Sequence, residues 1–210
     1  MVPTTDRPAL PELQPEVPRY DDDAALIAAS LHDGELFAQV YDRHSAAMYR
    51  FAARRLGPQV AEDAVSDAVL AAFRVRHRYD VARPDARPWL LGILTREISR
   101  RRRTERARYR VLARAGGLDE VQHEGPADRV AAAVAAQAVR APLASALAGL
   151  AARDRDVLLL VAWADLTYQE VADALAIPIG TVRSRLSRAR RQIRTALPDL
   201  ALALTDAEEA

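Results

Sequence analysis

One segment near the carboxyl end, residues 166–197, combines residue types that could bind DNA. Its final stretch, from Ile179 on, carries six arginines and no acidic residue. Arginine can donate two hydrogen bonds to guanine or hold a phosphate, and serine can contact a base or the backbone. A charged helix face is usually only solvated, but acid-free charge on the second of two helices joined by a short turn favours DNA binding. The chemistry predicted here is recognition of a nucleic acid.

Two helices must position these side chains. Thr167, with Glu170 three residues later, predicts a capping box at the start of the first helix, and Pro178 ends that helix after Ile177 packs inward. The buried stripe of the first helix is Val171, Ala172 and Leu175. Apolar residues in the second helix recur at helical spacing, at Val182, Leu186, Ala189, Ile193 and Leu197. The residues left on its other sides are Arg183, Ser184, Ser187, Arg188, Arg190 and Arg191. The pattern predicts a helix-turn-helix, whose second helix enters the major groove.

A second basic segment, from Arg96 to Arg114, holds nine arginines and two glutamates. We expect it to continue a long helix that starts near Trp89 and to follow DNA phosphates, because each neutralised phosphate releases counterions. The alternative is a solvated helix end favoured by the helix dipole. Tyr79 and Trp89 could stack on an unpaired base. A tryptophan in an apolar helix stripe is more often core, and we interpret Trp89 as core.

Composition limits the other classes of function. The 210 residues suffice for one or two domains, and the net charge of +1 conceals separate acidic and basic blocks. The chain has no cysteine, which excludes disulfides and thiolate metal sites. We find no signal peptide, and the longest strongly apolar run, residues 157–164, is too short to span a bilayer. We therefore expect a cytoplasmic protein without membrane insertion.

The helical pattern divides the chain. We expect a proline-rich disordered leader at 1–22, a first domain at 23–113, a linker with three glycines at 114–140, a second domain at 141–198 and a tail at 199–210. No segment alternates with a period of two residues, so the predicted fold class is all-α. The first helix of the first domain should bury Phe37, Val40, Tyr41, Met48, Phe51 and Ala52. Gly57-Pro58 should stop that helix, and the next one should turn Glu62, Asp63 and Asp67 outward.

Together the two halves resemble the bacterial RNA polymerase sigma factors of the extracytoplasmic-function (ECF) group, which keep two conserved domains called regions 2 and 4. Region 2 is matched by ELFAQVYDRHSAAMYRFAARRLG, AEDAVSDAVLAAF and ARPWLLGILTREISRRRR. Region 4 is matched by LAARDRDVLLLVAWADLTYQEVADALAIPIGTVRSRLSRARRQIR. The resemblance covers about residues 30–197 and implies two small helical domains joined by a flexible linker.

The resemblance also implies roles for particular residues. The polymerase-binding surface would include Asp63, Ser66 and Asp67. The residues facing the upstream, minus-thirty-five element would be Thr181, Arg183, Ser184, Ser187 and Arg188. Contacts to the downstream, minus-ten element would come from Arg96, Arg100, Arg101 and Arg103. Family members often have glutamine and glutamate at the positions of Ser66 and Asp67, and asparagine at that of Arg96.

Partners and mechanism follow from the same resemblance. Core RNA polymerase and promoter DNA are the implied partners, and an anti-sigma factor that clamps both domains is a common further one. The implied mechanism is recruitment of polymerase and strand opening, in which captured unpaired bases offset the cost of melting. Tethering two DNA-binding domains raises the effective concentration of each at its element.

Two rival interpretations remain. A stand-alone helix-turn-helix regulator explains residues 150–197 equally well, but not the long amino-terminal domain with its acidic face. An enzyme is disfavoured, since the histidines show no paired metal spacing and no phosphate-binding loop or nucleophile elbow is present. Those histidines are His32, His44, His77 and His123. We expect no catalytic residue, metal or cofactor, and interpret Asp21 to Asp23 as an acidic surface start of the first domain.

Overall fold

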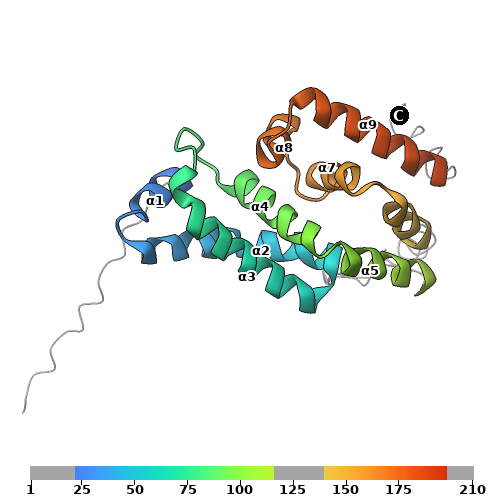
Figure 1. Ribbon diagram of the computed structural model, residues 1–210, viewed down its shortest axis with the longest axis horizontal. Coiled ribbons are helices and arrows are strands. Elements are labelled where there is room, and N and C mark those ends of the chain that lie inside the picture. Colours follow the sequence, from blue (N-terminus) through green and yellow to red (C-terminus); the bar gives the residue numbers. More distant parts are fainter. Residues whose placement is uncertain (1–21, 116–139, 198–210) are drawn as a thin grey trace, which may run out of the picture.

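The computed structural model describes residues 22–115 and 140–197, and each regular element in these two ranges is a helix (Figure 1). This confirms the predicted all-α class. The amino-terminal elements are α1 (Asp23–Ala29), the 3₁₀ turn η1 (Gly34–Leu36), α2 (Phe37–Leu56), α3 (Pro58–Val75), the 3₁₀ turn η2 (Arg76–Arg78), α4 (Arg87–Arg100) and α5 (Arg102–Ala115). The carboxyl-terminal ones are a helical stretch at 140–149, α7 (Ala152–Ala162), α8 (Tyr168–Leu175) and α9 (Ile179–Ala196). Residues 1–21, 116–139 and 198–210, with nearly all of the expected leader, linker and tail, lie outside the described residues.

A tight reversal joins α2 and α3 into a hairpin. Gly57 has a φ of 89°, which L side chains rarely adopt, and Pro58 occupies the first turn of α3, where its missing N–H is harmless. The predicted stop at Gly57-Pro58 is thus confirmed. Most of the predicted stripe of α2 is buried, but Tyr41 is 44% exposed and its assignment to the core is wrong. Tyr41 follows Val40 directly and so lies off the inward face.

The predicted single helix from Trp89 into the arginine run is two helices. Arg101 leaves helical geometry, with φ of −95° and ψ of 24°, and separates α4 from α5. The break lets the two helices take different partners: α4 packs on α3 and α2 and on α8 of the carboxyl-terminal part, whereas α5 packs on α2. Trp89 is only partly buried, with its ring edge-on to that of Tyr79 at 5.0 Å, so its interpretation as core holds only in part.

The carboxyl-terminal helices form a second small bundle, in which α9 packs on α7 and α8. Its helix α7 starts at Ala152, after the helical stretch at 140–149. The bundle contacts the amino-terminal part mainly where α8 lies against α4, while α9 lies on the side away from α2 and α3 (Figure 1). No helix in the two described ranges has the length and apolar character needed to cross a membrane.

Candidate nucleic-acid interface

The α8–turn–α9 unit is fixed by local interactions that the sequence predicted. Thr167 Oγ1 accepts a hydrogen bond from the N–H of Glu170 at 3.2 Å, and Glu170 Oε2 accepts one from the N–H of Thr167 at 2.7 Å. Ala176 then adopts a left-handed conformation with φ of 53°, and the N–H of Ile177 donates to the carbonyl of Ala172 at 2.9 Å. Pro178 follows as the N-cap of α9. The capping box and the turn are therefore confirmed.

The two sides of α9 differ as predicted. Val182, Leu186 and Ala189 are buried against α7 and α8, with Leu197 beyond the helix end buried as well. The arginines and serines on the opposite sides are exposed at Arg183, Ser184, Ser187, Arg188, Arg190 and Arg191. Thr181 is half-buried in the first turn, with its backbone N–H donating to the carbonyl of Pro178. Within the described residues, α9 thus presents an exposed cationic surface of the kind that enters a major groove.

One predicted DNA contact already has a partner. The Arg188 guanidinium lies 3.1 Å from a carboxylate oxygen of Asp154, whose side chain is almost fully buried at the start of α7. Arg183, at the other edge of the exposed face, makes no ion pair in the described residues. To hold a phosphate or a base, Arg188 must therefore either do so while still paired with Asp154 or give up that ion pair. Arg183 can bind DNA without breaking an ion pair.

The second basic surface covers α4 and α5. Arg96, Arg100 and Arg103 are exposed, and Arg101 is partly buried. Two of these four have acidic neighbours, because Glu97 lies 3.0 Å from Arg100 and Asp67 lies 2.5 Å from Arg101. Arg96 and Arg103 point outward and have no ion pair in the described residues. We therefore expect these two to contribute most to phosphate binding on this surface.

An acidic surface borders this basic one. Glu62, Asp63, Ser66 and Asp67 are exposed along α3, together with Leu70, which is 47% exposed. Acidic side chains beside an exposed leucine suit a surface that docks a basic protein partner. The same negative charge keeps this surface from binding DNA. The Asp67–Arg101 ion pair is the point where the predicted polymerase-binding and DNA-binding surfaces meet.

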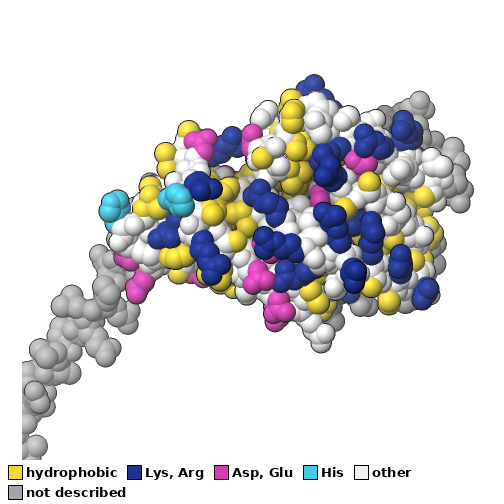
Figure 2. Space-filling view, in the orientation of Figure 1, with side chains coloured by type: hydrophobic (Ala, Val, Ile, Leu, Met, Phe, Trp, Pro, Cys, Tyr) yellow, Lys and Arg dark blue, Asp and Glu magenta, His cyan; other side chains and the backbone are white. Residues whose placement is uncertain are grey.

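The basic surfaces of the two parts lie on one face of the molecule. Figure 2 shows arginine side chains over α9 and a second group over α4 and α5. A groove of about 540 Å³ runs between them, with Arg102 and Arg106 of α5 on one side and Arg185 and Arg188 of α9 on the other. Both groups could therefore contact a polyanion approaching this face.

Comparison with known proteins decides the family. Residues 40–108 match the family profile of Sigma-70 region 2, and residues 140–193 match that of Sigma-70, region 4. The ECF RNA polymerase sigma factor SigK of Mycolicibacterium vanbaalenii is 32% identical over 176 residues, covering 83% of this chain and 88% of SigK. SigL of Mycobacterium tuberculosis is 32% identical over 179 residues, covering 84% of this chain and 97% of SigL. The chain belongs to the ECF sigma factors.

Two solved structures share its fold. CnrH, in complex with the cytosolic domain of CnrY, superposes with a TM-score of 0.57 at 24% identity, covering 85% of this chain and 99% of CnrH. RpoE of Bartonella quintana, in complex with the anti-sigma factor NepR, gives a TM-score of 0.52 at 24% identity, covering 77% and 96%. We therefore call the described residues 22–115 region 2 and residues 140–197 region 4 of this sigma factor.

Sequence reasoning missed a buried ion cluster between the two regions. We call it the interdomain ion cluster; its members are Arg55, Glu105, Arg155 and Asp156. Arg55 of α2 donates to Glu105 at 2.7 Å and to Asp156 at 2.6 Å. Arg155 of α7 donates to Glu105 at 2.7 Å, and all four side chains are buried. Arg55 lies four residues after Phe51 on the buried stripe of α2, a spacing that could have indicated its burial.

Opposite charges in this cluster offset the effect of burial on Arg55. Burial alone would lower the pKa of the Arg55 guanidinium, but Glu105 and Asp156 raise it above its ordinary value. Arg155 also donates to the carbonyls of Leu147 and Leu150, at 3.0 and 3.3 Å. Burial raises the pKa of the Asp156 carboxyl, although Arg55 acts against that rise. The cluster places two guanidinium groups and two carboxyl groups in mutual contact away from water.

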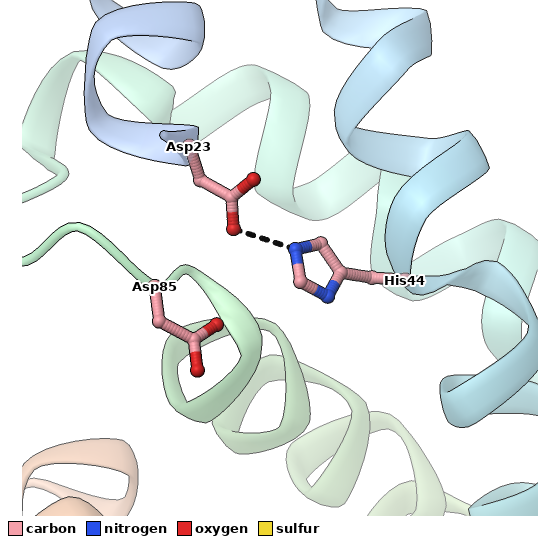
Figure 3. Close-up of side chains that lie close together, drawn as sticks. All are labelled: Asp23, His44 and Asp85. Carbon is pink, nitrogen blue, oxygen red and sulfur yellow. Dashed lines mark hydrogen bonds and ion pairs between the residues drawn. The ribbon is translucent and has the colours of Figure 1, made fainter. Parts of the chain in front are cut away.

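A second cluster shows that the interpretation of Asp21 to Asp23 as an acidic surface is wrong for Asp23, while Asp21 lies outside the described residues. Asp23 is 5% exposed, and its carboxylate lies 3.0 Å from Arg43 and 2.6 Å from His44 while accepting the N–H of Ala86 at 2.9 Å. Figure 3 shows that Asp23 and His44 point toward each other with Asp85 nearby. Their ligand atoms lie within 4.8 Å of one another, but Asp23 Oδ1 already accepts from Arg43 and Asp23 Oδ2 already contacts His44 and Ala86. The cluster joins α1 to α2 through the ion pairs of Asp23 with Arg43 and His44.

Asp23 makes region 2 sensitive to acid. Burial would raise the pKa of Asp23, but the hydrogen bonds from His44, Ala86 and Arg43 lower it to about 2, from an ordinary 3.8. A lowered pKa means that Asp23 stabilises the fold above about pH 4 and that this stabilisation is lost as the pH falls toward 2. We expect Asp23→Asn to lower the free energy of unfolding by about 1–2 kcal/mol at pH 7, the full shift being reduced by partial solvation.

Urea unfolding at pH 7 and at pH 2.5 would test this expectation, with Asp42→Asn on the exposed side of α2 as the matched control. The difference between Asp23→Asn and the wild type should shrink at the lower pH. An equal difference at both values would show that the charge of Asp23 is unimportant.

Proposed function

We propose that this sigma factor binds core RNA polymerase and directs it to promoters, with α9 of region 4 reading the upstream element and the α4–α5 surface of region 2 contacting the downstream element. The observation that carries the proposal is the exposed face of α9, where arginines and serines line one side of a helix seated on a helix-turn-helix core. We assign base contacts to the amino-terminal half of α9, beginning with Arg183 and Ser187.

Region 2 supplies the other two contacts in this proposal. The acidic face of α3, with Asp63, Ser66 and Asp67, would dock on core polymerase, and Leu70 would add apolar contact area. Arg96, Arg100, Arg101 and Arg103 would hold DNA strands at the minus-ten element. Arg101 is paired with Asp67, so it would have to contact DNA alongside that ion pair or give the pair up.

An anti-sigma factor is part of the proposal. CnrH and RpoE, which share the fold, were solved with CnrY and with the anti-sigma factor NepR. We propose a comparable partner here, acting in the cytoplasm where polymerase and promoter DNA are found. We also propose that the protein contributes recognition and strand opening and no catalytic step of its own.

Transcription in vitro tests the proposal. The purified chain is added to core polymerase with a set of genomic promoters, and we expect initiation at a restricted subset of them. Charge reversal by Asp63→Arg should weaken assembly with core polymerase about tenfold, because a basic partner surface would then face a like charge. Arg74→Ala, at the exposed end of the same helix, serves as a control.

The same preparation separates this function from that of a stand-alone helix-turn-helix regulator. A sigma factor should protect promoter DNA only when core polymerase is present, in two separate regions. A regulator would shift operator DNA alone, and that result would overturn the proposal.

A further inference from the structure

A buried acid of region 4 is paired with an arginine on the exposed side of α9. Asp154 lies in the first turn of α7 and its side chain is only 3% exposed, whereas the side chain of Arg188 is 50% exposed. Arg188 Nη1 donates to both carboxylate oxygens of Asp154, at 3.2 and 3.1 Å. Both residues line the same groove of about 540 Å³, together with Thr181 and Ser184 of α9. The pair therefore joins the inside of region 4 to the side of α9 that is open to a ligand.

Arg188 cannot leave this pair at little cost. Within the described residues, the hydrogen bonds that the Asp154 carboxylate accepts both come from Arg188 Nη1. A carboxylate so deeply buried is strongly destabilised when it loses its cation, because little water reaches it to replace the lost partner. Arg188 therefore contacts DNA most readily while it is still bound to Asp154.

A guanidinium held at one nitrogen still has a free edge. The group is planar with five N–H donors, and Nε and Nη2 form an edge that does not include Nη1. In the described residues, Nε and Nη2 of Arg188 donate no hydrogen bond. Two parallel donors of this kind match the O6 and N7 acceptors of guanine. Arg188 can therefore keep Asp154 and bind a base edge at the same time.

The acid also changes which DNA group suits Arg188. A guanidinium and a carboxylate in contact carry no net charge together, so the pair attracts a phosphate only weakly. A side chain that is already fixed in one orientation loses less conformational entropy when it binds. That advantage applies only to an acceptor that lies in the matching place, as a base edge in a groove does. The pairing therefore favours base recognition over phosphate binding at this position.

We propose that Asp154 is a positioning residue for promoter recognition, which holds Arg188 in one orientation so that the free edge of its guanidinium reads a guanine of the upstream element. The inference rests on the proposed function, in which the exposed side of α9 contacts that element. Asp154 touches no DNA and acts through Arg188. Without the acid, Arg188 is free to turn toward a phosphate, so base discrimination falls while charge-driven binding rises.

Asp154→Asn tests this proposal, because asparagine keeps the shape of the side chain and removes its charge. Asp154→Leu is a second variant, which leaves no unpaired polar group at the buried position should the amide destabilise region 4. Asp165→Asn, at an exposed acid in the loop before α8, is the matched control for the loss of one negative charge. Urea unfolding checks that each variant is folded.

The measurement is binding of the holoenzyme to promoter duplexes that each carry one replaced base pair in the upstream element. The double variant Asp154→Leu with Arg188→Ala leaves neither charge of the pair, and the base pair whose replacement no longer matters in it is the one that Arg188 reads. We expect Asp154→Asn and Asp154→Leu to lower discrimination at this base pair about threefold to tenfold and to leave the others unchanged.

Salt dependence supplies a second readout. In Asp154→Asn, the slope of log affinity against log salt concentration should steepen by about one, because the released Arg188 neutralises one phosphate. Asp165→Asn should match the wild type in its discrimination at every base pair.

A purely structural role for Asp154 predicts a different result. Binding that weakens by the same factor on every duplex, with no change in the salt slope, would mean that the acid only stabilises region 4, and would overturn the inference. Unchanged discrimination at the base pair that Arg188 reads would overturn it as well. A wild-type holoenzyme that binds all of the duplexes equally would instead overturn the proposed function, and the inference with it.

Discussion

Arg183→Ala should weaken binding of the holoenzyme to promoters with an upstream element by about 10- to 100-fold, since one arginine contact to a base is worth about 1–3 kcal/mol. Arg183 is exposed at the amino-terminal half of α9, near Ser187 and Arg190, and has no ion pair in the described residues. Its removal should therefore take away the proposed DNA contact and little else. Titration of holoenzyme against labelled promoter DNA at one fixed salt concentration measures the loss.

The choice of Arg183 depends on the structure. From sequence alone Arg188 is an equally good candidate, but Arg188→Ala would leave the buried carboxylate of Asp154 without its cation. An unpaired buried charge destabilises the fold, so a loss of binding in Arg188→Ala would mix two causes. Arg183→Ala should leave the free energy of unfolding within about 0.5 kcal/mol of the wild type.

Two comparisons make the result specific. Arg50→Ala removes the same charge from the exposed side of α2 and should have little effect. Promoters without an upstream element should respond only weakly to Arg183→Ala. A uniform loss across all promoters, with a reduced salt dependence, would identify Arg183 as a phosphate contact and contradict its role in base recognition.

Much of region 4 was predictable because its signals are local. The capping box links residues three apart, and the buried side of α9 repeats every three or four residues, so each can be recognised without knowing the fold. The exposure of Arg183, Ser184 and Ser187 follows from the same periodicity. Which bases these residues would contact does not follow from it, because that depends on how α9 would be oriented in a groove.

The features that were missed depend on distant residues. Arg55 and Asp156 are 101 positions apart, and Asp23 and Ala86 are 63 apart, so no local spacing relates them. Charged residues are normally exposed, and that expectation put Asp23 on the surface. The break at Arg101 has the same origin, because α4 and α5 pack on different partners, which only the tertiary structure reveals.

Glu105→Met should lower the free energy of unfolding by about 3–5 kcal/mol, the typical cost of leaving a buried charge unpaired. Glu105 accepts hydrogen bonds from both Arg55 and Arg155, and its side chain is 1% exposed. Without it, two guanidiniums share the single carboxylate of Asp156, and one positive charge is left over. Glu62→Met on the exposed side of α3 is the control, with an expected change below about 0.5 kcal/mol.

A double-mutant cycle with Arg155→Met distinguishes charge from packing. The double variant keeps one cation and one anion, the Arg55–Asp156 pair, so the charge left over in Glu105→Met disappears. If unpaired charge is the cause, the double variant should be more stable than Glu105→Met alone. The reason is that apolar residues of similar volume replace a buried ion pair at little cost in free energy. Urea unfolding of the four chains measures the coupling. Additive losses would mean that side-chain volume, and not the balance of charge, holds regions 2 and 4 together.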